Sequence, residues 1–370
     1  MRRLGIDVRK LADFGIGSYL QGLLGEFARR GEPRGFVVLV DPGGRHLLPE
    51  MPEDWQVVEV AARGYSVEEH FAVPLAAFRH GVATLHVPHY VVPALYPGKV
   101  VVTIHDIIHV LFPQFLRRGG LAYARLMIAR AVRRARRIVT PSTTTAHDLQ
   151  RLFGTSAEKL LVIPHGVDQE FLQPAGPADQ AALERLGVAR PYLLHVGNHK
   201  PHKNVEGLLK AYQILVHAGR GETPPLVLVG GFSADGVLAR RAVAMGLGGR
   251  VRCLGHVERA ELAALFRGAT LFLYPTLYEG FGLPVLEAMA SGVPVVAGDI
   301  PAVREVAGDA VERVNPRDVV ALANTVRRLL DQAEHRRELA ARGRARARLY
   351  SWQRAAEATL SLYRAVEAEA

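Results

Sequence analysis

The sequence holds very little cysteine and no long apolar run. Cys253 is the only cysteine among 370 residues, so no internal disulfide can form and a cysteine-rich zinc site is excluded. No window of about 18 apolar residues occurs, so we expect no membrane-spanning helix. The N-terminus also lacks the apolar run of a signal peptide. These absences favour a cytoplasmic protein, peripheral to the inner face of a membrane at most.

Three motifs are absent as well, and each absence argues against a class of protein. No Asp-x-Asp pair follows a predicted strand, which argues against a metal-bridged diphosphate. No Gly-x-Gly-x-x-Gly follows a strand, which argues against a dinucleotide-dependent dehydrogenase. The formal net charge of +10 suggests a protein that binds nucleic acid, but a base-stacking signature is missing. We therefore expect no metal and no nucleic-acid partner.

Short apolar runs alternate with helical patterns along most of the chain, which predicts parallel sheets covered by helices. We predict an α/β fold with two Rossmann-like, doubly wound domains, at residues 1–170 and 185–350, and a helix at about 352–370 that packs back on the first. In such sheets ligands bind beyond the carboxyl ends of the strands, here in a cleft between the domains. The predicted strands are 36–40, 57–60, 100–104, 138–140 and 160–163, then 192–196, 226–229, 251–254, 270–274, 293–297 and 310–314. The predicted helices include 121–137, 143–153 after the N-cap Ser142, and 327 to the end with a joint near 350–352.

The loop after the predicted strand 270–274 carries most of the chemistry. Gly280 and Gly282 let backbone amides approach a ligand closely. A helix that begins at Pro284 offers free N–H groups, which favour a phosphate. The loop therefore lies at the carboxyl end of a strand and at the start of a helix, where a parallel sheet binds its ligand.

Two carboxylates flank this helix start. Glu279 lies just before it and Glu287 about one turn inside it, so both can accept hydrogen bonds from the hydroxyls of one ligand. The alternative is a buried helix after a glycine turn, in which Lys203 or a nearby arginine neutralises the glutamates. The residue pattern alone leaves both interpretations open.

Glu279, seven intervening residues and Glu287, with Gly-Phe-Gly-Leu-Pro between them, resemble the signature of glycosyltransferase family 4. The following residues 288–296 also match the family pattern, and the resemblance covers most of the chain, most strongly 191–310. It implies the GT-B fold and a retaining, metal-independent transfer of a hexose. The donor would be a nucleoside-diphosphate sugar, a co-substrate that makes a further cofactor unnecessary.

The resemblance also implies roles for the residues of this loop. Glu287 would bind the ribose hydroxyls of the nucleotide, and Glu279 would bind a hydroxyl of the transferred sugar. Backbone amides would hold the sugar and the diphosphate at Gly280, Phe281, Gly282 and Leu283.

A second segment follows the first strand of the second domain. Family members carry there a lysine that, with another basic residue, neutralises the leaving nucleoside diphosphate, and Lys203 before Asn204 matches this lysine. A helix N-terminus disfavours cations, so an anionic partner is a better interpretation of Lys203 than a solvated side chain. Its companion stays open between Asn198, Lys200 and His202, because the arginine common in the family is absent.

Two further positions belong to the first domain. Gly17, in Gly-Ile-Gly before a helical run, matches the family's first glycine-rich loop, and the alternative is a plain tight turn. His105 follows a strand and resembles the family's active-site histidine, which would contact the sugar or the acceptor with Asp106 orienting its ring. The alternative is a histidine with a structural role, and this alternative holds equally for His86 and His89 at another strand end. We predict His105, Glu279 and Lys203 as the catalytic residues.

Eight arginines and no acid occupy residues 117–137, with apolar residues spaced between them. This pattern predicts an amphipathic basic helix, which favours peripheral contact with an anionic membrane. The alternative is a domain helix with an arginine-rich solvent face. The arginines are Arg117, Arg118, Arg125, Arg130, Arg133, Arg134, Arg136 and Arg137.

Together these features predict a hexosyltransferase of polysaccharide biosynthesis. We expect a donor of the GDP-mannose or UDP-glucose type and an acceptor hydroxyl on a glycan or a lipid-linked glycan. A nucleotide-sugar epimerase is the alternative on the same fold. A nucleic-acid-binding protein is the alternative that charge alone suggests.

Overall fold

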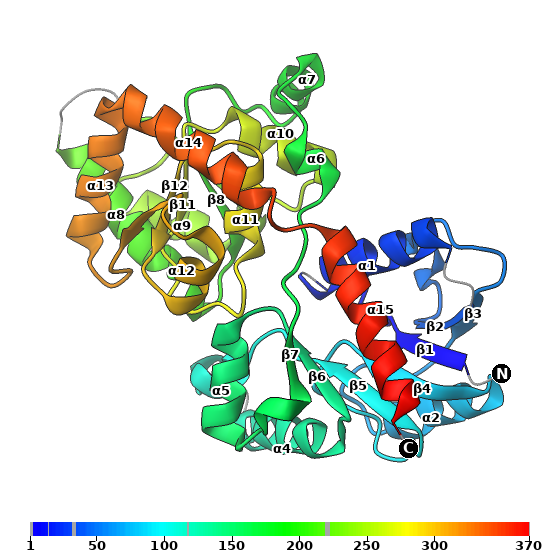
Figure 1. The fold of residues 1–370 in the computed structure, drawn as a ribbon. Helices are drawn as coiled ribbons and strands as arrows, with labels where there is room; N and C mark the ends of the chain where they lie inside the picture. Colours follow the sequence, from blue (N-terminus) through cyan, green and yellow to red (C-terminus); the bar gives the residue numbers. More distant parts are fainter. Residues whose placement is uncertain (1–2, 14, 32–34, 117, 219–222, 370) are drawn as a thin grey trace. The chain divides into compact units, whose positions relative to one another are not determined.

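A computed structural model describes residues 3–13, 15–31, 35–116, 118–218 and 223–369. The chain divides into two compact units, which are described separately (Figure 1). Unit 1 comprises Met1–Gly166 and Ser351–Ala370, and unit 2 comprises Val167–Tyr350. Among the described residues, no helix combines the length and the apolar character needed to cross a bilayer.

Unit 1 is built on one parallel sheet of seven strands in the order β3-β2-β1-β4-β5-β6-β7. The order reverses between β1 and β4, so the strands that follow each of these two diverge to opposite edges. The strands are β1 (Arg3–Asp7), β2 (Phe36–Val40), β3 (Gln56–Glu59), β4 (Val82–Val87), β5 (Lys99–Thr103), β6 (Arg137–Thr140) and β7 (Leu160–Val162).

Helices cover both faces of this sheet. On one face, α1 and the C-terminal helix α15 share a core cluster with Trp352 and Tyr363, and on the other face α2 and α4 share a second cluster (Figure 1). The C-terminal helix is therefore part of the first unit's core. The helices are α1 (Ile16–Arg30), α2 (Glu69–Arg79), α3 (Ile108–Leu111), α4 (Gly120–Arg134), α5 (Thr143–Phe153) and α15 (Trp352–Ala368), with short 3-10 turns η1 (Gly44–Leu47), η2 (Pro113–Phe115) and η3 (Ala157–Lys159).

Unit 2 repeats this winding with six parallel strands in the order β10-β9-β8-β11-β12-β13. The order reverses between β8 and β11, which are hydrogen-bonded neighbours. Ligands of doubly wound sheets bind at such a reversal, beyond the carboxyl ends of the strands. The strands are β8 (Leu193–Asn198), β9 (Leu226–Gly231), β10 (Val251–Gly255), β11 (Leu271–Tyr274), β12 (Val295–Gly298) and β13 (Glu312–Val314).

The helices of unit 2 connect these strands in the alternating manner that the sequence predicts. They pack the two faces of the sheet into two core clusters. The elements are α6 (Gln169–Leu172), α7 (Pro177–Arg185), η4 (Pro201–Lys203), α8 (Val205–His217), α9 (Val237–Ala244), α10 (Arg259–Gly268), α11 (Leu283–Ala290), α12 (Pro301–Ala307), α13 (Val319–Asp331) and α14 (Ala333–Ala347).

The predicted fold class of two doubly wound α/β units is confirmed, and the N-cap at Ser142 is observed as well. The Ser142 side chain accepts a hydrogen bond from the Thr145 N–H at 3.1 Å, and the helix then runs from Thr143 to Phe153 as predicted. Because the cap satisfies a backbone donor that the first helical turn cannot, the start of this helix is fixed locally.

Several predicted boundaries are wrong. The strand expected from residue 293 begins at Val295, because the Val293 N–H bonds back to the Ala288 carbonyl and Pro294 has no N–H to donate. The helix expected to reach residue 137 ends at Arg134, since Arg137 already pairs with β5 as the first residue of β6. The helical stretch expected from residue 327 is interrupted near 350–352 as predicted, but it has a second break between α13 and α14, and α13 already begins at Val319.

Candidate active site

The loop between β11 and α11 is held by its backbone before any side chain is considered. Helix α11 begins after Gly282, whose φ of 99° lies in the left-handed region that favours glycine. The other end of the loop is fixed to η4, because the Leu277 N–H donates to the His202 carbonyl at 2.7 Å and Thr276 Oγ1 lies 2.9 Å from the same carbonyl oxygen. The predicted loop follows β11 and is therefore held against the segment that follows the neighbouring strand, β8.

Lys203 and Glu279 form an ion pair at this reversal of the sheet. Lys203 Nζ donates to Glu279 Oε1 at 2.8 Å and to the Tyr274 hydroxyl at 2.6 Å. The Tyr274 hydroxyl in turn donates to the same carboxylate oxygen at 2.9 Å, and Thr276 Oγ1 donates to it at 2.8 Å. One carboxylate oxygen thus receives three donors from η4, β11 and the loop.

The protonation of Glu279 follows from this arrangement. Burial alone would raise the pKa of its carboxyl group, but the charges of Lys203 and His202 and the hydrogen bonds from Lys203 and Thr276 outweigh burial. The pKa is therefore lowered from its ordinary value, and the group is a carboxylate at neutral pH. Burial, together with the neighbouring carboxylate, raises the pKa of Tyr274 well above its usual value, so Tyr274 stays a donor.

Each partner of the ion pair keeps an unused hydrogen-bonding position. An ammonium group has three N–H donors, and described residues accept two of those on Lys203. A carboxylate has two oxygens, and within the described part of the chain only Oε1 of Glu279 receives donors. Both side chains are 12% exposed, so solvent or a ligand reaches them.

Asn204 fixes the segment that places Lys203 next to Glu279. Its backbone is left-handed at φ 53°, which asparagine tolerates better than most residues. Its side-chain amide donates to the carbonyls of Pro275 and Pro316, at 3.0 and 2.6 Å. The Lys-Asn pair therefore combines a cation with the residue that fastens the loop next to β11.

Glu287 lies inside α11 and is 9% exposed. Burial raises the pKa of its carboxyl group to about 7, although the charge of Arg259 opposes the rise. Arg259 is itself paired with Asp168. No described residue donates a hydrogen bond to the Glu287 carboxyl group, which leaves both oxygens for a ligand.

The candidates for the companion of Lys203 have different environments. Asn198 ends β8, and its side-chain oxygen accepts the Lys200 N–H at 3.2 Å, which closes a turn. The side chain of Lys200 is exposed, whereas His202 is 4% exposed. Of these three candidates, Lys200 is the cation whose exposed side chain can extend toward an anion.

In unit 1, Gly17 lies in the first turn of α1, after β1. A Cβ atom at this position would lie 2.2 Å from the Leu11 carbonyl oxygen, so no larger residue fits without a shift of the backbone. Gly15, before the helix, has a φ of 75°. Both observations agree with the alternative of a plain tight turn, and a role for Gly17 toward a ligand stays a prediction.

His105 follows β5 and contacts other aromatic side chains. Its Nδ1 lies 3.2 Å from His165 Nε2, and its ring packs edge-on against Tyr19 with centroids 4.9 Å apart. Burial lowers the pKa of His105 to about 4, although the Pro88 carbonyl opposes the shift, so the ring is neutral at physiological pH. The carboxylate of Asp106 accepts the Ile108 N–H at 2.9 Å, at the first residue of α3. The ring partner that the structure gives for His105 is His165.

His86 and His89 have structural roles rather than lining an open surface. His86 is fully buried, with Nδ1 2.5 Å from the Tyr363 hydroxyl and Nε2 2.7 Å from Thr103 Oγ1. His89 Nε2 lies 2.8 Å from the Tyr65 hydroxyl, and its Nδ1 accepts the Val91 N–H. Both nitrogens of each ring are used inside unit 1, which supports the structural alternative for both histidines.

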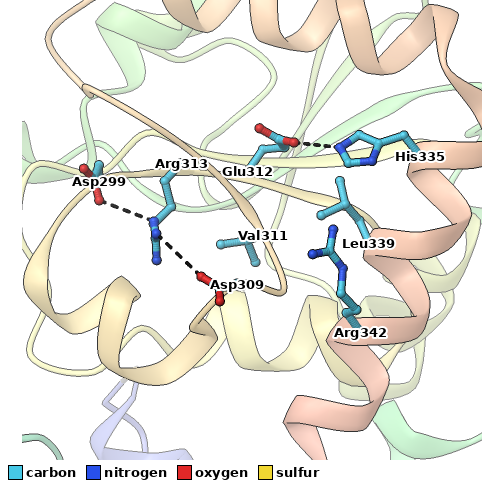
Figure 2. A pocket seen from close by; sticks show the side chains of 8 residues that line it. All are labelled: Asp299, Asp309, Val311, Glu312, Arg313, His335, Leu339 and Arg342. Carbon is cyan, nitrogen blue, oxygen red and sulfur yellow. Dashed lines mark hydrogen bonds and ion pairs between the residues drawn. The ribbon is translucent and has the colours of Figure 1, made fainter.

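A hollow of about 500 Å³ lies elsewhere in unit 2, between β13 and α14 (Figure 2). Most of its charged side chains pair with one another: Glu312 Oε1 lies 2.7 Å from His335 Nε2, and Arg313 lies 3.5 Å from Asp299 and 3.9 Å from Asp309. It shares no lining residue with the candidate site. Because most of its charges are already paired, we assign no ligand to it.

Within the described ranges, no three His, Cys, Asp or Glu side chains form a group that could hold a metal ion. The charged side chains on which the candidate site rests are instead Lys203, Glu279 and Glu287. The arrangement suits a ligand that offers hydroxyls to the carboxylates and negative charge to the lysine and the helix start.

Sequence reasoning missed Tyr274 and Thr276, which supply two of the three donors to Glu279. A signal for Tyr274 was present, because a tyrosine that ends a buried strand needs a partner for its hydroxyl. The partner itself depends on the pairing of β8 with β11, which no local pattern reveals.

Two family models match the chain. Glycosyltransferase Family 4 matches residues 15–171, and Glycosyl transferases group 1 matches residues 183–346. Together they cover all the strands described above except β1, and they include His105, Lys203, Glu279 and Glu287.

Curated relatives agree with these matches. O-antigen chain mannosyltransferase B of Escherichia coli is 32% identical over 270 residues, which are 72% of this chain and 70% of the relative. The MMP alpha-(1->4)-mannosyltransferase of Mycolicibacterium hassiacum is 34% identical over 242 residues, and the match spans 64% of this chain but little more than half, 56%, of that relative. Neither name supports the epimerase or the nucleic-acid alternative.

Among solved structures, HepE of Anabaena in complex with UDP-glucose superposes with a TM-score of 0.78. The match covers 98% of this chain and 99% of that one at 19% identity, which supports the fold. The predicted GT-B architecture is therefore confirmed.

Proposed function

The chain belongs to glycosyltransferase family 4, and from this membership we propose that it transfers a hexose from a nucleoside-diphosphate sugar to an acceptor hydroxyl with retention of configuration. The two curated relatives above are named as mannosyltransferases, which favours mannose as the transferred sugar. An O-antigen enzyme among them favours a glycan or a lipid-linked glycan as the acceptor.

The observation that carries this proposal is the incompletely satisfied ion pair of Lys203 and Glu279. Its unused N–H and its unused oxygen form a neighbouring donor and acceptor of opposite charge. A sugar diphosphate offers the complementary groups, namely an anionic oxygen next to a hydroxyl. We assign the sugar hydroxyl to Glu279 Oε2 and a diphosphate oxygen to Lys203 Nζ.

Glu287 and the start of α11 complete the donor site in this proposal. The ribose hydroxyls donate to the Glu287 carboxylate, which accepts no hydrogen bond from a described residue. Backbone amides at 280–283, at the start of α11, bind the diphosphate because a helix N-terminus carries partial positive charge. Lys200 adds a second cation, while Asn198 shapes the turn from which Lys200 extends. These groups take the place of a metal ion, so we propose a metal-independent reaction.

In the proposed reaction the bond between the anomeric carbon and the diphosphate oxygen breaks, and a bond to the acceptor oxygen forms on the same face. The proton of the acceptor hydroxyl passes to the departing phosphate oxygen. Lys203 stabilises the negative charge that develops on that phosphate, and Glu279 orients the sugar. We further propose that the neutral ring of His105 contacts the sugar or the acceptor, and that the backbone at Gly17 contacts the donor phosphate.

A thermal-shift panel of GDP-, UDP- and ADP-sugars tests the donor class. A ligand that binds only the folded state raises the free energy of unfolding by RT ln(1 + [L]/Kd), about 2.7 kcal/mol at a hundred times Kd. We expect one sugar nucleotide to raise Tm in the wild type and not in Lys203→Ala. Equal shifts in both proteins would contradict the assigned site, and product analysis of the stabilising donor distinguishes transfer from epimerisation.

A further inference from the structure

Large apolar side chains that face solvent gather on one layer of unit 1. Helix α2 exposes Phe71 at 59%, Leu75 at 48% and Phe78 at 77%. These residues are four and three apart, so they share one side of the helix. The opposite side is apolar too, since Val73 and Ala77 are buried. A helix that is apolar on all sides is typical of buried positions, so its exposed side suggests an apolar partner.

Helix α4 belongs to the same layer, because side chains of α2 and α4 enter one core cluster on the same face of the sheet. It too exposes large apolar side chains, with Tyr123 at 38% and Leu126 at 54%. The outer sides of α2 and α4 therefore both face away from the same face of the sheet.

The loop between β4 and β5 joins the two helices. The Ala94 N–H donates to His70 Nδ1 of α2 at 3.2 Å, and Arg134 of α4 donates to the Tyr96 carbonyl at 2.8 Å. Between these two attachments lies Leu95, which is 57% exposed. We call the exposed side chains of this layer the α2–α4 surface, defined by Phe71, Leu75, Phe78, Leu95, Tyr123 and Leu126.

The charges around the α2–α4 surface are mainly positive. Arg118, Arg125 and Arg133 are exposed, and none of them forms an ion pair with another described residue. Glu68 is an exposed acid at the start of α2, whereas Glu69 is buried against Arg9. Arg136 and Arg137 contribute little, because both pair with Glu369 near the C-terminus.

We propose that the α2–α4 surface docks on an anionic lipid bilayer, with the aromatic and leucine side chains in the headgroup boundary and the arginines on the lipid phosphates. An interface helix has this combination of an apolar face and flanking arginines. A second copy of the chain fits less well, because a symmetric dimer would place the arginines of one copy against those of the other. The surface is wider than the basic helix predicted from the sequence, whose Arg117 lies outside the described residues. The proposal does not depend on the donor site.

Vesicle sedimentation with the full chain tests this docking without donor or acceptor. We expect binding to vesicles of phosphatidylglycerol and phosphatidylcholine, and much weaker binding to phosphatidylcholine alone. Phe71→Ser/Phe78→Ser should weaken partitioning about a hundredfold, from the apolar area lost. Arg125→Gln/Arg133→Gln should weaken it roughly thirtyfold at low salt and less at high salt.

Control variants change exposed apolar side chains or exposed arginines on other surfaces. Val237→Ser/Val243→Ser removes two side chains that are 61% and 66% exposed, and Arg342→Gln/Arg348→Gln removes two exposed arginines. Both control variants should bind vesicles like the wild type, and all variants should keep the wild-type Tm. Wild-type binding that ignores phosphatidylglycerol, or a loss equal in test and control variants, overturns the proposal. A concentration-dependent dimer that Phe71→Ser/Phe78→Ser dissociates would overturn it in favour of a second copy.

Discussion

The two units wind their sheets alike but place different chemistry near the reversal. Unit 1 carries imidazoles in and after β4, β5 and β7, and burial keeps His86, His105 and His165 neutral. Unit 2 carries a full ion pair, Lys203–Glu279, after β8 and β11. The two units therefore share a strand topology that places side chains near the reversal. They differ in the side chains themselves, which are neutral in unit 1 and charged in unit 2.

The largest expected effect tests the charged side of this contrast. Lys203→Ala or Glu279→Ala should lower kcat/KM for transfer by at least about 10²–10³, because each removes a group that contacts developing or bound charge. Steady-state transfer assays on folded protein, checked by circular dichroism, measure this. Either variant with full activity on the true donor would refute the assignment.

A charge-neutral double variant separates catalysis from stability. Lys203→Met/Glu279→Gln leaves no uncompensated buried charge, so its stability should exceed that of either single alanine variant. Its transfer activity should remain low. Recovery of activity along with stability would show that the pair serves only the fold.

The neutral side of the contrast predicts that unit 1 is sensitive to acid. Burial lowers the pKa of His86 to about 3, so the folded state binds fewer protons than the unfolded chain between that value and about 6.5. The contribution of His86 to the free energy of unfolding is therefore largest above pH 6.5. It decreases as the pH drops, by about 2 kcal/mol at pH 5.

Tryptophan fluorescence reports this unfolding selectively, because the two tryptophans, Trp55 and Trp352, both belong to unit 1. We expect the midpoint of the unfolding transition that fluorescence reports to decrease when the pH is lowered from 7.5 to 5. The decrease should be smaller in His86→Leu. A midpoint that does not change over this range would contradict a buried neutral imidazole.

Tyr274→Phe probes the connection between the two charges. Its hydroxyl accepts from Lys203 and donates to Glu279. A hydrogen bond to a charged group contributes about 1.5–3 kcal/mol, so kcat/KM should fall about ten- to a hundredfold. Tyr192→Phe is the matched control, because that buried hydroxyl donates to the Leu265 carbonyl instead. Equal losses of activity in both variants would point to general destabilisation.

The smallest effect concerns the titration of Glu287. Its pKa of about 7 means that the folded state holds a proton that the unfolded chain has lost, so this group's contribution to stability declines as the pH rises from about 4.5 through 7. Donor binding should show the opposite trend, since hydroxyls donate to the ionised form. We expect about tenfold weaker binding of the sugar nucleotide at pH 6 than at pH 8.

Calorimetric titration across this range measures the change, and Glu287→Gln is the reference because glutamine does not titrate. The variant should bind with an affinity that varies little with pH. A wild type whose affinity is equally constant would remove Glu287 from the nucleotide site.

The fold and the position of the donor loop could be predicted because both rest on local patterns. Alternating apolar runs indicated the strands, and the glycines before Pro284 marked the loop between β11 and α11. The environment of each side chain could not be predicted in the same way. The sequence left Lys203 open as a ligand of an anion or as the partner of the glutamates. Its pairing with Glu279 depends on β8 lying beside β11, a contact between residues 76 positions apart.

Boundaries failed where a backbone interaction overrode the apolar pattern. Val293 is apolar and was assigned to a strand, but its N–H closes the end of α11. The strand Arg3–Asp7 was not among the predictions, although it lies at the reversal of the first sheet. It is short and flanked by charged residues, so its apolar pattern is weak.

The placement of α15 sets an order of events during synthesis. Unit 2 is one continuous stretch, Val167–Tyr350, inserted between the two parts of unit 1. The core around α1 includes Trp352 and Tyr363, and a Cβ atom at Gly22 would lie 2.2 Å from the Trp352 ring, so α15 packs closely on α1. On the ribosome, the first unit therefore begins to form earliest but is completed last. The segment in between can finish folding while the first unit still waits for its final helix.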